Sequence, residues 1–155
     1  MLFVAEEGPI LHHGQVVYVQ KDQAFNFVPQ QITDCSVLIG DVELGFMISP
    51  NKSKRASQVW GYCGSPARWI QQRLQVPVFF SGSLLLCNEM IDEGDIVRLE
   101  GSQAWNISYD QATSWVCIGD ATFTQDDVAV EFATNCGVVL QKDQLKALWL
   151  KPIFE

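Results

Sequence analysis

The chain has 155 residues, of which 48% are hydrophobic and 18% are charged, and its formal net charge is −8. A chain of this length buries roughly 70% of the surface that its unfolded form exposes, so we expect one globular domain over residues 1–155 and exclude a disordered chain. No apolar run approaches the roughly 20 residues that cross a bilayer, and the first residues carry no basic segment. We therefore expect a cytoplasmic protein with no membrane association.

Short apolar runs separated by turn residues dominate the first two thirds of the chain and predict β-strands. The predicted strands are Leu2–Ala5, Gln15–Gln20, Ser36–Ile39, Val42–Ile48, Gln58–Cys63, Val76–Phe80, Leu84–Cys87 and Asp95–Leu99. Most of the connections between them are too short for a helical crossover, which favours antiparallel pairing.

One α-helix is predicted, from about Pro66 to Leu74. Ser65 is a suitable N-cap, Pro66 suits the first helical position, and the apolar residues that follow recur at spacings of three and four. The residue before Pro77 is pushed out of the α region, so the helix must end before it.

The C-terminal third has the clearest strand pattern. Trp105–Tyr109 and Val128–Phe132 alternate with a period of two, and the polar residues 142–144 separate two further strands, Val138–Gln141 and Leu145–Leu150. Together these elements predict a mainly β member of the α+β class. We expect an antiparallel curved sheet, built as a sandwich or a half-barrel, with the one short helix.

The acidity of the chain is regional. Between Glu89 and Glu131 there are ten carboxylates and one cation, Arg98. Such a field can dock a basic partner, because it accelerates the encounter and adds specificity. We therefore predict a non-catalytic binding protein of the immunity or antagonist type, whose protein partner is basic. The predicted contact residues are Glu89, Asp92, Glu93, Asp95, Asp126 and Asp127.

Other interpretations of the acidic stretch remain open at this point. The same residues also fit charged turns that keep a small domain soluble. The 92–95 segment lacks the alternating oxygen ligands of an EF-hand, and the five cysteines are scattered without a C-x-x-C pair. We therefore expect no metal site, no disulfide framework and no cofactor.

A loop from Gly61 to Arg68 offers an enzymatic alternative. Cys63 lies just before the predicted helix, where the helix dipole and the backbone amides lower the pKa of a thiol. The C-x4-R spacing of Cys63 and Arg68 resembles the active-site loop of rhodanese-type sulfurtransferases. This resemblance covers only the loop, and it implies that Cys63 carries a persulfide and that Arg68 binds the anionic substrate.

A third alternative is a carrier of a small apolar ligand, bound between the sheet and the helix. No residue in the sequence singles out this function.

The only basic cluster, around Lys52, Lys54 and Arg55, is too small for a nucleic-acid surface, which needs a wider stripe of charge. The five tryptophans suit a core, although one or two of them could anchor an interface. We expect a monomer or a homodimer.

Overall fold

The computed structural model describes residues 1–87 and 90–155. These residues form mostly β-strands, together with two single-turn 3₁₀ helices, η1 (Pro66–Arg68) and η2 (Ser102–Ala104). The strands are β1 (Leu2–Glu7), β2 (Gln15–Val19), β3 (Ala24–Val28), β4 (Cys35–Ile39), β5 (Val42–Ile48), β6 (Lys54–Tyr62), β7 (Ile70–Gln71), β8 (Phe80–Cys87), β9 (Ile96–Arg98), β10 (Ile107–Asp110), β11 (Trp115–Gly119), β12 (Val128–Ala133), β13 (Cys136–Gln141), β14 (Gln144–Leu150) and β15 (Ile153–Phe154).

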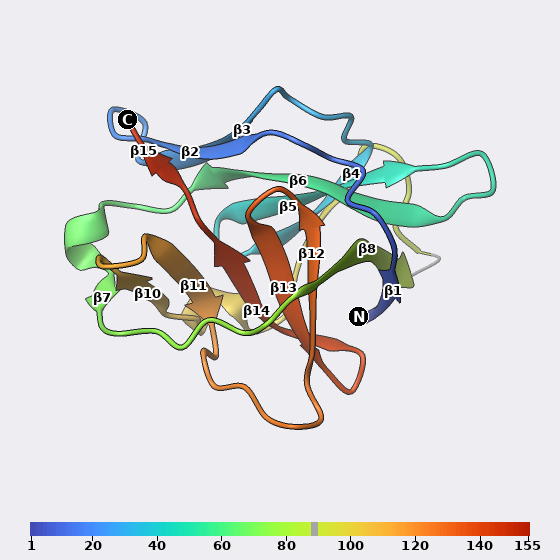
Figure 1. Cartoon of the computed structure of the whole chain (residues 1–155). Coiled ribbons are helices and arrows are strands. Elements are labelled where there is room, and N and C mark those ends of the chain that lie inside the picture. Colours follow the sequence, from blue (N-terminus) through green and yellow to red (C-terminus); the bar gives the residue numbers. More distant parts are fainter. Residues whose placement is uncertain (88–89) are drawn as a thin grey trace.

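The strands join into one sheet that curls into a half-barrel (Figure 1). The main path runs β15-β2-β3-β6-β8-β12-β13-β14-β11-β10-β7, while β5, β4 and β9 branch from β6 and β1 pairs with β8. Most pairs are antiparallel. The parallel pairs are β4–β9, β7–β10, β8–β12 and β2–β15. The predicted mainly β, curved sheet is therefore confirmed.

Local turn chemistry explains the hairpin between β13 and β14. Gln141 pairs with Gln144, so the turn consists of Lys142 and Asp143. Both residues have positive φ angles, of 51° and 63°, as a type I′ turn requires. This turn matches the twist of the flanking strands, and the predicted polar connection is confirmed.

The predicted α-helix from Pro66 to Leu74 is wrong. The Ser65 hydroxyl does accept a hydrogen bond from the Ala67 N–H at 3.3 Å, but the helix ends after the single turn η1. Residues 70–71 then pair with β10 as β7, and the Leu74 N–H donates to Asp110 Oδ2 at 3.0 Å. Backbone groups that a helix would satisfy internally are thus satisfied by partners distant in sequence.

The predicted strand Val76–Phe80 is also wrong, apart from Phe80, which begins β8. Residues 72–79 form an extended strap that crosses β11, β14 and β13, as the light green trace in Figure 1 shows. Leu74, Val76 and Phe79 pack there in a second, smaller core around buried Trp149. Gly137 permits this close packing, because a Cβ atom at that position would lie 2.5 Å from the Phe79 ring.

The two ends of the sheet path meet through aromatic side chains. Trp69 lies at the centre, with ring centroids 5.6 Å from Tyr18, 5.9 Å from Phe25 and 5.7 Å from Tyr109. Phe154 of β15 adds a contact of 5.3 Å with Tyr109. We call these five residues the aromatic seam. Through Trp69, which directly follows η1, these side chains join β2, β3 and β15 to β10.

Candidate functional site

The carboxylates of the acidic stretch lie in separate places. The 92–95 loop is held beside β4, because the Gly94 N–H donates to the Asp34 carbonyl at 2.7 Å. The 120–127 loop connects β11 to β12 at the bottom of the view in Figure 1, whereas β4 lies at the upper right. Glu89, a predicted member of the acidic face, lies outside the described residues.

The 120–127 loop uses a carboxylate to build the fold. Asp127 Oδ2 lies 2.6 Å from Lys146 Nζ, and it also accepts a hydrogen bond from the Thr124 N–H at 2.9 Å. Burial opposes ionisation of Asp127, but these bonds outweigh it and lower the pKa. The Asp127 side chain is fully buried, so it differs from its predicted role as a surface contact, whereas the adjacent Asp126 is exposed.

Two further carboxylates of the stretch also hold backbone in place. Asp110 accepts hydrogen bonds from the N–H groups of Leu74 and Ala112, both at 3.0 Å, and the bond from Leu74 contributes most to a lowered pKa. Glu131 Oε2 accepts from the Asn135 N–H at 2.8 Å, across the turn between β12 and β13. Regional acidity in the sequence therefore does not translate into one acidic face.

Two of the predicted contact residues, Asp92 and Glu93, line a groove of about 800 Å³, which we call the charged groove. It is lined by Asp34, Ile48, Asn51, Lys52, Lys54, Asp92 and Glu93. Asp92 and Glu93 are exposed, and Asp34 Oδ2 accepts a hydrogen bond from the Ile48 N–H at 2.7 Å. Asp95 Oδ2 accepts the Asp92 N–H at 2.8 Å and so holds the acidic loop in shape.

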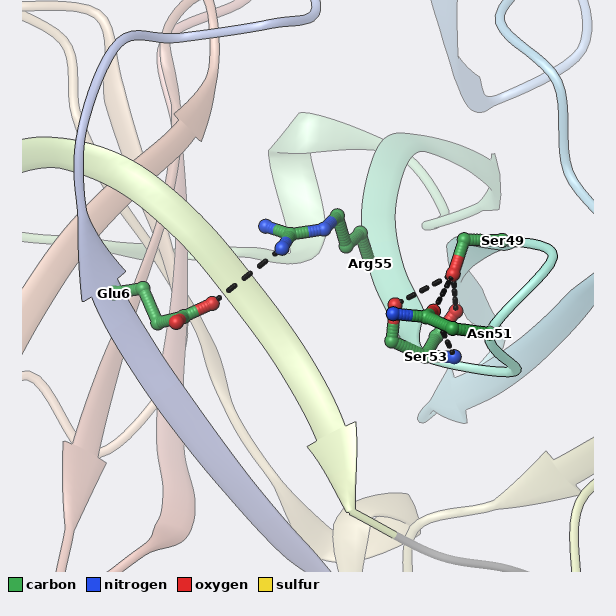
Figure 2. Close-up of polar contacts among 5 residues, drawn as sticks. All are labelled: Glu6, Ser49, Asn51, Ser53 and Arg55. Atoms are coloured by element: carbon green, nitrogen blue, oxygen red, sulfur yellow. Dashed lines mark hydrogen bonds and ion pairs between the residues drawn. The ribbon is translucent and has the colours of Figure 1, made fainter.

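The turn between β5 and β6, drawn in Figure 2, contributes Asn51 and Lys52 to the lining of the charged groove. Ser49 Oγ hydrogen-bonds to the side chains of Asn51 and Ser53, and the Ser53 N–H donates to Asn51 Oδ1 at 3.1 Å. These bonds fix a tight loop in which Lys52 has a φ of 67°. Lys52 and Lys54 line the groove, so it carries both signs of charge.

The third member of the predicted basic cluster points elsewhere. Arg55 forms an ion pair with Glu6 of β1, with an N–O distance of 3.6 Å, and the pair spans β8 (Figure 2). Both side chains are partly exposed, so the pair contributes little stability. It leaves Lys52 and Lys54 as the cations of the groove.

The loop that resembles a rhodanese active site lacks the expected electrostatics. Cys63 is buried, its Sγ lies 3.5 Å from the Gln23 carbonyl, and burial raises the pKa of the thiol to about 12. The thiol is therefore protonated at neutral pH, whereas a nucleophile needs the thiolate. The Arg68 side chain is exposed, and η1 is too short to supply a helix dipole.

These thiol environments predict a specific reactivity pattern. In the folded protein at pH 8, we expect Cys87 alone to react rapidly with an aromatic disulfide reagent, because it is exposed while the other four cysteines are buried. All five should react in guanidinium, and Cys87→Ser should remove the rapid phase. A rapid phase that disappears in Cys63→Ser would instead support the enzymatic alternative.

A larger groove, of about 920 Å³, lies between the strap and the 119–123 segment. Val78, which is 94% exposed, and Phe123 contribute apolar surface, but Gln72, Arg73 and Asp120 also line it. The apolar-ligand alternative requires a space between the sheet and an α-helix, and that helix is not formed.

The sequence does not single out Asp34 or Trp60, although both line cavities. Asp34 lies before β4, and the pairing of β4 with β9 brings the acidic loop beside it. Trp60 lies in a third cavity, of about 330 Å³, over β3 and β6. Successive residues of a strand point to opposite faces, and Val59 of β6 lies in the core. This alternation could have placed the neighbouring Trp60 on the outer face.

Within residues 1–87 and 90–155, no group of three or more His, Cys, Asp or Glu side chains is arranged to hold a metal ion. No helix among the same residues has the length and hydropathy needed to span a bilayer. A scan against protein-family models found no match, and a search of curated proteins found no significant relative.

Proposed function

We propose that this protein is a non-catalytic binding protein whose charged groove docks a basic segment of a protein partner, in the manner of an immunity protein or antagonist. The convergence of Asp34, Asp92 and Glu93 on one open groove supports this proposal. These carboxylates come from segments nearly sixty positions apart, so their proximity is a product of the fold.

The electrostatics of the groove favour a particular partner. Asp92 and Glu93 are exposed, and no hydrogen bond within the described part of the chain uses either side chain. A lysine or arginine of a partner can therefore pair with them, and the net charge of −8 steers such a partner toward the protein. Lys52 also lines the groove and repels a uniformly basic segment, so we expect the partner to offer an acidic or acceptor group beside it.

Apolar surface beside the acidic loop can add affinity. Met90 is 86% exposed and Ile96 is 59% exposed, on either side of residues 92–95. Among the described strands, β9 pairs only with β4, so its second edge is available to an extended peptide. Apolar contacts together with main-chain hydrogen bonds would supply the affinity that exposed ion pairs do not.

Two double variants that have the same net charge test whether the groove binds the partner. Asp92→Asn with Glu93→Gln, and separately Asp22→Asn with Asp126→Asn, each remove two negative charges from exposed positions. The probe is a fluorescent extended peptide of alternating lysine and valine in which one lysine is replaced by glutamate to face Lys52, and its binding is measured by polarisation at low and high salt. We expect about tenfold weaker binding for the groove variant, since two exposed ion pairs contribute roughly 1.4 kcal/mol together.

The control variant should bind within about twofold of the wild type, because its charges lie outside the groove. Equal losses in both variants would show that only net charge matters. No binding by the wild-type protein at low salt would also contradict the proposal.

A further inference from the structure

A second site lies on the outer face of the sheet, over β3, β6 and β5. Phe25 and Phe27 of β3 and Val59 of β6 point into the core, so the residues between them face outward. Trp60 pairs directly with Glu43 of β5, and the register of β3 with β6 brings Asn26 to its other side. An amide, an indole and a carboxylate thus form a row across three strands.

The Trp60 ring is fixed in place. Its indole N–H donates to the Glu43 carboxylate, whose pKa is raised by burial and lowered in part by this bond. Gly45 makes room for the ring, since a Cβ atom there would lie 3.2 Å from Trp60 Cζ3 and 2.6 Å from Thr33 Oγ1. Because its N–H is already satisfied and its body is only partly buried, the ring offers an aromatic surface at little entropic cost.

Amide groups surround this ring. The Gln58 side chain is 1% exposed, with Oε1 accepting the Gln31 N–H at 2.7 Å and Nε2 donating to Thr33 Oγ1 at 3.1 Å. The orientation of the Gln58 side chain is therefore set, and it holds the 31–33 segment against β6 at the cavity. Asn26 and Gln30 are exposed at the same cavity, which has a volume of about 330 Å³.

We propose that this cavity binds a ring of a neutral saccharide, stacked on Trp60 and hydrogen-bonded through its hydroxyls to the exposed amides of Asn26 and Gln30. A pyranose ring has an apolar C–H face that suits an aromatic surface, while each of its hydroxyls both donates and accepts. A planar amide presents a donor beside an acceptor and can bond two neighbouring hydroxyls. The six residues that line the cavity carry no charge, which favours a neutral ligand over an ionic one.

An array of immobilised glucose-, galactose-, mannose- and N-acetylglucosamine-containing oligosaccharides, together with sialylated and sulfated ones, tests the ligand class. We expect binding to at least one neutral saccharide, with a dissociation constant then measured by calorimetry. Its addition should also shift the indole N–H resonance of Trp60. Binding confined to the charged saccharides, or no binding at millimolar concentration, would overturn the proposal.

Variants locate the site independently of folding. Asn26→Ala with Gln30→Ala changes only exposed side chains, and we expect it to weaken saccharide binding about tenfold. Trp60→Ala should abolish binding, and Trp60→Phe should retain part of it if the alanine variant does not fold. Ile32→Ala, at a 65% exposed position between β3 and β4 that does not line the cavity, is the matched control. Unchanged binding by the Asn26 and Gln30 variant would refute the site.

The saccharide site does not depend on the charged groove. The variant with Asp92→Asn and Glu93→Gln should bind the saccharide as the wild type does, and Trp60→Phe should bind the lysine-valine peptide as the wild type does. Failure of one proposal therefore leaves the other standing.

Discussion

Replacement of Trp69 by alanine is expected to lower the free energy of unfolding by about 3–5 kcal/mol, the range observed when a buried tryptophan is truncated in a core. Trp69 is 5% exposed and contacts the rings of Tyr18, Phe25, Tyr109 and Phe154. Among the strands of residues 1–87 and 90–155, no backbone ladder closes the half-barrel at this seam, so loss of the ring removes the packing that joins the two ends of the sheet path. Urea unfolding followed by far-UV circular dichroism measures the change.

Two control variants separate ring packing from hydrogen bonding. The Trp69 indole N–H donates to the Cys63 carbonyl at 3.0 Å, so Trp69→Phe loses this bond but keeps an aromatic ring in the seam. We expect Trp69→Phe to lose less than half of what the alanine variant loses. Trp105→Ala makes the same change at a partly exposed position and should cost less. A loss below about 1 kcal/mol for Trp69→Ala would contradict a closing role for the seam.

Removal of the Asp127 carboxylate should have the next largest effect. Asp127→Ala leaves the Lys146 ammonium, on a side chain that is 7% exposed, without its buried counterion. It also removes the acceptor of the Thr124 N–H. Breaking a buried ion pair from one side costs about 3 kcal/mol or more, because the remaining charge stays desolvated. Urea unfolding at pH 7 checks this expectation.

A double-mutant cycle identifies the source of that loss. Asp127→Ala combined with Lys146→Met removes both charges, and we expect it to be more stable than Asp127→Ala alone. If the double variant is less stable than Asp127→Ala by the full cost of Lys146→Met, the two side chains do not interact and the ion pair does not stabilise the fold.

Acid should weaken the same interaction. The pKa of Asp127 is lower in the folded protein than the ordinary value of 3.8, and the same holds for Asp110. A carboxyl whose pKa is depressed on folding stabilises the native state above its unfolded-state pKa, and this contribution disappears as the pH falls through the folded-state value. Stability should therefore fall as the pH drops below about 3.8, with a shallower fall in Asp127→Ala.

The β-strand pattern and the hairpins follow from local sequence. Val42–Ile48 is a strand with the predicted bounds, and the polar connection after residue 141 forms the expected tight turn. Such segments are predictable because alternation records which side chains are buried, and turn residues record which φ angles the backbone must adopt. Residues 92–95 are likewise a charged turn, and the residues of this segment alone are enough to predict it.

The predicted helix is wrong because the hydrogen-bond partners that replace it lie elsewhere in the chain. Residues 65–74 satisfy the local signals of a helix start, but β10 and the Asp110 carboxylate provide hydrogen bonds that local signals do not contain. The strap over Trp149 is invisible in the sequence for the same reason. A short helix is only marginally stable by itself, so tertiary partners decide its outcome.

The residues of the candidate sites were also predictable only in part from the sequence. By itself the sequence determined a mainly β curved sheet, tight polar turns and the excess of carboxylates between residues 89 and 131. Only the tertiary structure decided that Asp127 is buried against Lys146, that Asp34 joins Asp92 and Glu93, and that Trp60 lies between Asn26 and Glu43. Patterns along the chain report the burial of each residue, whereas charge pairing and cavity lining depend on distances through space that strand pairing sets.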